Sequence, residues 1–368
     1  MKKKEFKFWE PYHLLIYNAD YYLVIGERSN GKTTGVLGLF LEEFCNSKYT
    51  KQCAIIRRYD EDLKSNKAKQ LFEGVVSLGW VKKYSKGEFN TIYFYGGQWF
   101  LAFYNDKGEK EKVCETPFAF AFSISGADHF KSISFPNIYN ILFDEFLSRD
   151  FYMVNEFVEF QNLLSTIIRL KDGVKIFMCG NTVNKYSPYF TEMGLKNIKK
   201  MKEGTIDVYS YGNTDLKVVV EYCSSSKNTN KKSNKYFAFD NPRLQMIKEG
   251  SWEIDIYPHL PFKYIPKDVI FKYYIEFDTE KFECEVIMKN ESLFTFIHRK
   301  TTPIIELNYP VYSTQILARY NYSANILYPR NDVEKFILLQ FRDKKVFYQD
   351  NEVGESIRNF LMYCQKNK

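Results

Sequence analysis

The sequence predicts an α/β protein with two domains, a first built on a central, mostly parallel sheet and a second, smaller one. Three observations support this prediction. The chain has 368 residues, which is enough for two hydrophobic cores of ordinary size. Its first half alternates short apolar runs with segments of helical periodicity, as a parallel sheet with crossover helices requires. The stretch SSSKNTNKKSNK at 224–235 is polar and of low complexity, which is typical of a linker.

The apolar patterns place the elements of the first domain. Strands are expected at residues 21–25, 53–56, 138–143 and 174–179, and helices at 34–44, 61–76 and 154–170. Residues 89–104 alternate in polarity on either side of Gly96 and Gly97, which predicts a hairpin added to the sheet.

After residue 203 the pattern changes to consecutive strand-like runs. A small hairpin is expected at 206–211 and 216–222, and three further strands at 269–277, 282–288 and 293–298. Another apolar run covers 333–340, and a closing helix is expected at 354–364. We therefore predict an N-terminal domain at 1–203, a basic linker with a small hairpin at 204–235, and a C-terminal domain at 236–368.

Composition excludes several classes of protein. A chain that is 45% hydrophobic and 26% charged is folded rather than disordered. The seven cysteines show no CxxC spacing, so we expect free thiols in a reducing compartment and no zinc site. No stretch approaches the roughly 18 to 20 apolar residues that cross a bilayer. The sequence therefore indicates a cytoplasmic protein with no membrane partner.

The net charge of +7 is concentrated in one segment. Between Lys171 and Lys235 there are 12 lysines, no arginine and 6 acidic residues. This segment is either a solvated linker surface or a surface that contacts a polyanion. Lysines beside phosphates release counterions and give affinity that does not depend on base sequence.

A phosphate-binding loop is the strongest motif in the sequence. Residues 26–33, GERSNGKT, match the pattern GxxxxGK[ST] between an expected strand and an expected helix. Lys32 would reach the β and γ phosphates of a nucleotide, and the Thr33 hydroxyl would ligate Mg²⁺. We therefore predict that ATP and Mg²⁺ bind here. The expected binding residues are Gly26, Glu27, Arg28, Ser29, Asn30, Gly31, Lys32, Thr33, Thr34 and Asp144.

Two acidic residues end the apolar strand ILFDEF. Asp144 is suited to hold Mg²⁺ together with Thr33, and Glu145 is suited to orient and deprotonate an attacking water. A glutamate at this position is typical of P-loop hydrolases with an additional catalytic strand (the ASCE type), and nucleotide kinases and GTPases generally lack it. The pair therefore predicts an ATPase.

Further polar residues complete the expected catalytic site. Asn181 follows the strand expected at 174–179 and could contact the γ-phosphate or the attacking water, although a Gly-Asn pair also forms turns. Phosphoryl transfer is also helped by an arginine, which a neighbouring subunit often supplies. Arg169, at the end of the helix after the acidic pair, is the first candidate, and Arg149 and Arg28 are its rivals.

These motifs together resemble one known family. The loop GERSNGKT, the strand end FDEF, and the segments LLSTIIR and GNTVNKYSPYF are similar to those of the DNA-packaging ATPases of short-tailed phages. These are the podovirus DNA encapsidation proteins, which are related to terminase large subunits. The similarity covers about residues 10–200. It implies a homomeric ring, a pentamer, which drives double-stranded DNA into an empty procapsid in the host cytoplasm.

The resemblance also implies partners and roles. The ring would act transiently at the portal vertex of the procapsid, and a packaging RNA between ring and portal is a further candidate partner. Lys32 and Thr33 would bind nucleotide, Asp144 and Glu145 would form the acidic pair, and Arg169 matches an arginine finger that acts in trans. Weaker candidates for DNA contact are Arg57, Arg58 and the lysines of 196–202.

For the second domain the resemblance implies a ribonuclease H-like α/β fold without nuclease activity. The segment around Asp278 fits the opening hairpin of that fold. A two-metal nuclease needs several carboxylates that converge, and no such arrangement is recognisable among Glu276, Asp278, Asp332, Asp343 and Asp350. Two alternatives stay open: a terminase large subunit with an active C-terminal nuclease, and a non-motor nucleotide switch.

Overall fold

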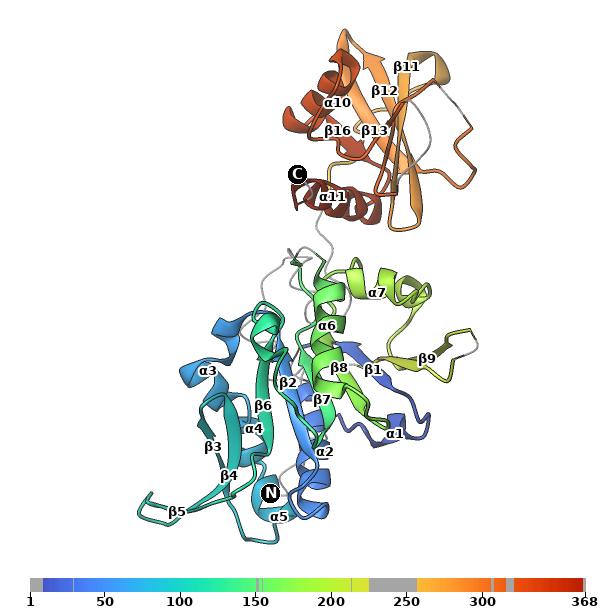
Figure 1. Cartoon of the computed structure of the whole chain (residues 1–368). Helices are drawn as coiled ribbons and strands as arrows, with labels where there is room; N and C mark the ends of the chain where they lie inside the picture. Colours follow the sequence, from blue (N-terminus) through green and yellow to red (C-terminus); the bar gives the residue numbers. More distant parts are fainter. Residues whose placement is uncertain are drawn as a thin grey trace. The chain divides into compact units, whose positions relative to one another are not determined.

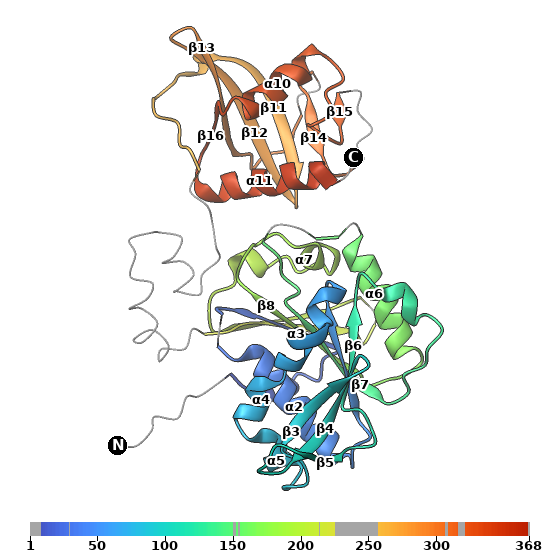
Figure 2. The same cartoon turned by 90° about the vertical axis from the view of Figure 1, so that its left-hand side faces the viewer.

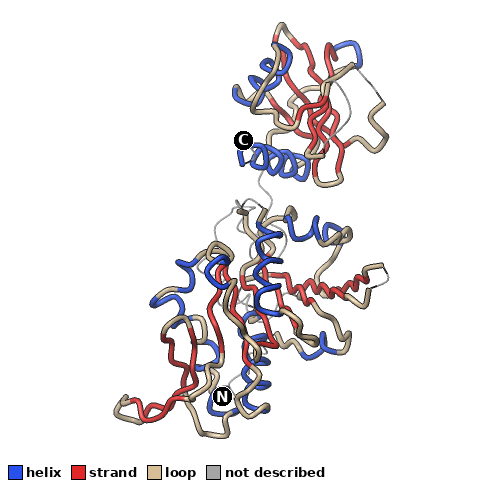
Figure 3. The backbone as a smooth tube through the Cα atoms, viewed as in Figure 1, coloured by secondary structure: helices blue, strands red, loops and turns tan. Residues whose placement is uncertain are grey.

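The chain divides into two compact units, the second of which contains the chain from residue 253 onward. Each unit holds one β-sheet, drawn in red in Figure 3. The computed structural model describes residues 9–28, 30–149, 152–153, 155–212, 214–224, 257–305, 308–315 and 321–366. The predicted domain boundary at 235/236 lies outside these described residues.

The first unit is built around a ten-stranded sheet with the strand order β3-β4-β6-β2-β7-β8-β1-β10-β9, and β5 pairs with β4. The strands from β6 to β10 in this order pair in parallel. Their carboxyl ends therefore meet at one edge of the sheet, where α/β proteins bind ligands. These parallel strands are β6 (Ala119–Ser123), β2 (Gln52–Arg57), β7 (Ile138–Asp144), β8 (Lys175–Asn181), β1 (Tyr21–Gly26) and β10 (Lys217–Tyr222).

Antiparallel strands extend both edges of this sheet. β3 (Thr91–Tyr95) and β4 (Gln98–Tyr104) form the predicted hairpin, to which β5 (Lys110–Val113) adds. Their two-residue turn, Gly96-Gly97, has φ values of 58° and 78°, which glycine adopts without steric cost. At the other edge, β9 (Thr205–Ser210) pairs with β10.

Helices cover both faces of the sheet (Figures 1 and 2). The core that α2 (Lys32–Asn46) forms on one face includes Leu142 of β7. On the other face α6 (Glu156–Ile168) packs against β7, where the rings of Phe143 and Phe160 are 5.1 Å apart. Successive residues of a strand point to opposite faces. β7 is therefore buried on both sides, which explains its continuous apolar sequence.

The prediction of a single helix at 61–76 is wrong. Lys64 has extended backbone (φ −101°, ψ 148°) and separates a 3-10 turn from the helices that follow. This break lets Leu63 and Phe72 both enter the core that also buries Trp99. The short elements of the first unit are α1 (Tyr12–Leu15), η1 (Asp60–Leu63), α3 (Ser65–Gln70), α4 (Glu73–Ser77), α5 (Trp80–Tyr84), η2 (Ala127–Phe130), α7 (Pro188–Glu192) and η3 (Ile198–Lys200).

The hairpin predicted at 206–222 belongs to the main sheet and not to a linker. β10 pairs in parallel with β1 over five residues, from Tyr21 opposite Val218 to Ile25 opposite Tyr222. Val219 lies in the middle of this pairing and is fully buried. The first unit therefore includes residues beyond the predicted boundary at 203, because β10 completes the core beside the strand that leads to the phosphate-binding loop.

The second unit contains a six-stranded sheet with the order β15-β14-β11-β12-β13-β16. Its first three strands in the sequence form the predicted antiparallel meander, joined by the turns Asp278-Thr279 and Asn290-Glu291. Both turns have positive φ at both positions, the geometry favoured by two-residue hairpins. The strands are β11 (Val269–Phe277), β12 (Glu280–Lys289), β13 (Ser292–Arg299), β14 (Val311–Ser313), β15 (Tyr322–Ser323) and β16 (Val346–Tyr348).

Two helices are described in the second unit. α10 (Asp332–Arg342) accounts for the apolar run at 333–340, and α11 (Asn351–Lys366) is the predicted closing helix. α11 packs on the sheet through Phe360, whose ring lies 5.9 Å from that of Phe277. A 3-10 turn, η4 (Pro266–Asp268), precedes β11. Among the described helices, none is long and apolar enough to cross a membrane.

The pairing of β10 with β1 can be tested by substitution. Val219→Asn would place an amide in the core without a partner, and we expect it to lower the free energy of unfolding by about 2 to 4 kcal/mol. Lys217→Asn, at an exposed position of the same strand, should change it by less than about 0.5 kcal/mol. Urea unfolding measures both, and equal effects would contradict the placement of β10 in the sheet.

Candidate active site

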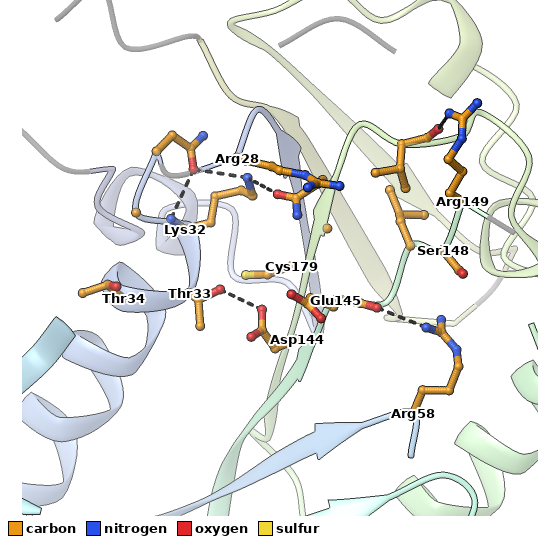
Figure 4. A pocket seen from close by; sticks show the side chains of 16 residues that line it. Arg28, Lys32, Thr33, Thr34, Arg58, Asp144, Glu145, Ser148, Arg149 and Cys179 are labelled. Atoms are coloured by element: carbon orange, nitrogen blue, oxygen red, sulfur yellow. Dashed lines mark hydrogen bonds between the residues drawn. The ribbon is translucent and has the colours of Figure 1, made fainter. Parts of the chain in front are cut away.

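The phosphate-binding loop joins β1 to α2 at the carboxyl edge of the main sheet, as predicted. The Lys32 side chain contacts the loop itself (Figure 4). Its Nζ donates to the carbonyl oxygens of Gly26 (3.2 Å) and Glu27 (2.6 Å) and to Oδ1 of Asn30 (3.2 Å). Gly31, directly before α2, has a φ of 91°, a left-handed conformation that glycine adopts readily.

A cavity of about 570 Å³ lies against this loop and is lined by most of the predicted site residues. Gly26 and Glu27 contribute the carbonyl groups that hold Lys32. Ser29 lies outside the described residues. The predicted residues that line the cavity are Arg28, Asn30, Gly31, Lys32, Thr33, Thr34, Asp144, Glu145 and Asn181.

Lys32 also connects the loop to β8. Its Nζ donates to Oδ1 of Asn181, the last residue of β8, at 3.3 Å. Only 5% of Lys32 is exposed, and this burial lowers the pKa of its ammonium group. A cation that has lost its water gains more from a nearby anion than an exposed one does. Lys32 is therefore well placed to bind a phosphate in the cavity.

Thr33 and Asp144, the two predicted magnesium ligands, are in contact. The Thr33 hydroxyl donates to Oδ1 of Asp144 at 2.7 Å. Hydroxyl and carboxylate oxygens are the ligands that Mg²⁺ prefers, and a nucleotide phosphate would complete such a site. The donor set therefore fits the ion. Burial raises the pKa of the Asp144 carboxyl group above its ordinary value, and the positive charge of Arg57 opposes this shift.

Arg57 belongs to the site, although it was predicted only as a candidate for DNA contact. Its Nη2 lies 2.6 Å from Oδ2 of Asp144, and its Nη1 lies 2.7 Å from Oε2 of Glu145. One guanidinium group thus bridges both acidic residues. Arg57 ends β2, which pairs directly with β7, with Ile56 opposite Phe143. The candidate role in DNA contact does not fit these ion pairs.

Arg58 is also part of the site and not of an exposed basic surface. It is 9% exposed, and its Nε donates to both carboxylate oxygens of Glu156, at 3.0 Å and 2.9 Å. A buried guanidinium group that is hydrogen-bonded to both oxygens of a carboxylate is unavailable to DNA. The signal that could have found both arginines is their position directly after a buried strand, at the edge where the other site residues lie.

The candidate arginines separate into two groups. Arg28 and Arg149 line the cavity, and Nη1 of Arg149 donates to the carbonyl of Val183 at 3.2 Å. Arg169 does not line it, because α6 runs from the carboxyl edge of the sheet back toward the start of β8, and Arg169 follows its last turn. The Arg169 side chain is exposed, and its Nη2 donates to the carbonyl of Ile133 at 2.8 Å.

The sequence matches a family of known proteins. The family model of the podovirus DNA encapsidation protein (Gp16) matches residues 1–232. The chain belongs to this family. The DNA packaging proteins of Bacillus phages PZA and phi29 are each 26% identical to it over 186 residues, which cover 50% of this chain and 49% of each relative. The chain therefore spans about half the length of these relatives.

Two solved structures of packaging motors resemble the whole chain. The bacteriophage Phi-29 viral genome packaging motor assembly has 18% sequence identity and a TM-score of 0.57, with 98% of this chain and 99% of that chain covered. The Phi-28 gp11 DNA packaging motor has the same identity and coverage and a TM-score of 0.54. At this identity the likeness establishes the fold, and it confirms the predicted α/β class.

The contact between Arg57 and Asp144 predicts a shift in the pH dependence of nucleotide binding. In Arg57→Gln, the Asp144 carboxyl group loses the charge that opposes the effect of burial, so its pKa should rise further. Magnesium binds the ionised carboxylate. The acidic limb of Mg²⁺-dependent binding should therefore move to higher pH.

A fluorescent ATP analogue, titrated with Mg²⁺ at a series of pH values, measures this shift. Arg342→Gln, in the second unit, serves as the control and should leave the profile unchanged. An unchanged profile in Arg57→Gln would contradict the electrostatic role of Arg57.

Proposed function

We propose that this chain is an ATP-driven motor that translocates double-stranded viral DNA into a preformed procapsid as a homomeric ring, a pentamer, at the portal. One observation carries the proposal. The phosphate-binding loop, the Thr33–Asp144 pair and Glu145 line a single cavity in a member of the DNA encapsidation family.

The proposed reaction is hydrolysis of ATP. The triphosphate would lie along residues 26–34, with Lys32 against the β and γ phosphates and Thr33 and Asp144 as ligands of Mg²⁺. When bound, Mg²⁺ would neutralise part of the phosphate charge. Glu145 would accept a proton from the attacking water. β8 lies between β1 and β7, which supports the additional-strand ATPase type, and Asn181 at its end would contact the γ-phosphate.

We assign Arg169 as the arginine that one subunit supplies to its neighbour. Its side chain is exposed and lies outside its own cavity. A positive charge near the transferred phosphoryl group stabilises the transition state and can come from another chain. This assignment makes the ring the catalytic unit. The rivals Arg28 and Arg149 would act within their own subunit.

The proposed partners of the ring are double-stranded DNA, the portal of the procapsid and a packaging RNA. Lys196, Lys200 and Lys202 have exposed side chains and remain candidates for contact with a phosphate backbone. The linker lysines after residue 224 lie outside the described residues. The proposed place of action is the host cytoplasm, transiently at the portal vertex.

We propose that the second unit is a degenerate nuclease-like domain that serves binding. Its first three strands are antiparallel neighbours, and β14 and β15 continue in parallel from β11. This arrangement supports the ribonuclease H-like assignment. Among the candidate carboxylates, Asp332 and Asp343 lie at opposite ends of α10, and Asp350 is bound to Arg299 at 3.1 Å.

The described residues offer one other cluster of possible metal ligands, Glu283, Glu285 and His298. Lys272 forms ion pairs with both glutamates, at 2.5 Å and 3.1 Å, and Lys300 pairs with Glu283 at 3.0 Å. The lysines already neutralise the two carboxylates. This favours a structural role for the cluster over the metal site that an active terminase nuclease needs.

The ATPase assignment predicts distinct effects for two variants. Glu145→Gln should lower kcat for ATP hydrolysis by about 10²- to 10⁴-fold and leave nucleotide binding intact, because it removes the base and not the phosphate contacts. Lys32→Ala should lose nucleotide binding. Glu291→Gln, in a turn of the second unit, serves as the control and should hydrolyse ATP like the wild type.

The motor assignment is tested by packaging. Purified procapsids, ATP and DNA are mixed with the protein, and DNA that resists added nuclease is measured. Wild type should protect DNA, and Glu145→Gln should not. Intact ATP hydrolysis without protection, indifferent to DNA and procapsids, would favour the non-motor switch.

The assignment of the second unit predicts no nuclease activity. Supercoiled plasmid incubated with the protein and Mg²⁺ or Mn²⁺ should stay uncut, because a two-metal site needs free carboxylates and those of the described cluster are paired with lysines. Robust cutting that Asp278→Asn removes would show an active terminase large subunit instead.

A further inference from the structure

Arg58 joins the carboxyl ends of β2 and β7. It follows the last residue of β2, and its Nη2 donates to the carbonyl of Phe146 at 2.8 Å. Its Nη1 donates to the carbonyl of Glu145 at 3.5 Å (Figure 4). Arg58 therefore holds the backbone of the two residues that follow Asp144. The Glu145 carboxylate itself pairs with Arg57.

The backbone that Arg58 holds is strained. Glu145 has a φ of 58°, a left-handed conformation that costs a residue with a side chain about 1 to 2 kcal/mol. Such a conformation persists only where its surroundings enforce it. On the side of β8, the Phe146 amide donates to the carbonyl of Cys179 at 3.2 Å. Arg58 and β8 thus hold the turn that sets the direction of the Glu145 side chain.

Arg58 is fixed in turn by two other buried residues. Glu156 is 1% exposed and accepts hydrogen bonds from Arg58 at 3.0 Å and 2.9 Å. The Tyr189 hydroxyl donates to Oε1 of the same carboxylate at 2.9 Å, and Tyr189 is fully buried. Glu156 starts α6, and Tyr189 lies in α7, within the SPYF segment. The residue after β2, the start of α6 and the helix α7 are therefore joined next to the turn that follows β7.

We propose that Arg58, Glu156 and Tyr189 are positioning residues for the catalytic Glu145. A buried ion pair contributes little to stability compared with apolar side chains of the same size. Its geometry can nevertheless place two backbone carbonyl groups, which an apolar cluster cannot do. The inference rests on the proposed function, because the direction of Glu145 matters only if this residue activates water.

The decisive variant replaces both charges, Arg58→Met together with Glu156→Leu. Replacement of a buried ion pair by apolar residues is often neutral for stability, so Tm should stay near that of the wild type. The hydrogen bonds to the carbonyls of Glu145 and Phe146 are lost. We expect kcat for ATP hydrolysis to fall by about 10- to 100-fold, because small misplacements of catalytic groups lower rates by factors of this size. KM for ATP should change by less than about twofold, because the phosphate-binding loop is untouched.

Two further variants sharpen the test. Tyr189→Phe keeps the ring in the core and removes one hydrogen bond from Glu156, and we expect a smaller fall in kcat, with KM unchanged. The matched control is Arg330→Met with Glu334→Leu in the second unit, where Arg330 pairs with a carboxylate that is 2% exposed. This control should keep the kcat of the wild type.

The outcomes separate the inference from the proposed function. A double variant that keeps both its Tm and its kcat would show that the network does not position Glu145 and would overturn the inference. If the double variant loses stability, the Tyr189→Phe variant becomes the test. An unchanged kcat in Tyr189→Phe would then overturn the inference. A wild-type protein that hydrolyses no ATP would instead overturn the proposed function.

Discussion

The parallel pairing of β2, β7, β8 and β1 is the constraint on which the site depends. Because these strands run in the same direction, their last residues meet at one edge, and each brings one kind of polar group there. β1 leads to Lys32, β8 ends in Asn181, β7 ends in Asp144, and β2 ends in Arg57. A shift of one residue in this register would turn the side chains of Asn181, Asp144 and Arg57 to the opposite face of the sheet.

Buried charge is the second organising feature. Lys32, Asp144, Arg58 and Glu156 are each less than 10% exposed, and each has a partner of opposite charge or a set of hydrogen bonds. A buried charge without such a partner would cost several kcal/mol. The groups around the cavity are therefore interdependent, and a change in one alters the electrostatics of its neighbours.

The local motifs were predictable because each follows from a short stretch of sequence. The loop at 26–33 and the acid pair at 144–145 carry their chemistry in adjacent residues, and alternation around Gly96-Gly97 marks a hairpin. The roles of Arg57 and Arg58 were not predictable in this way, because they depend on which strand lies beside β2. Tertiary packing also decided the break at Lys64 and the placement of β10, which local periodicity does not encode.

The end of β10 lies against the phosphate-binding loop and restricts its movement. The Cys223 amide donates to the carbonyl of Ile25 at 2.8 Å, so the chain leaves β10 directly beside the start of the phosphate-binding loop. A Cβ atom placed on Gly26 would lie 3.1 Å from Cβ of Cys223, so there is little free space between loop and strand. A movement of the loop at Gly26 would therefore displace Cys223 as well, so the loop and the end of β10 are expected to move together.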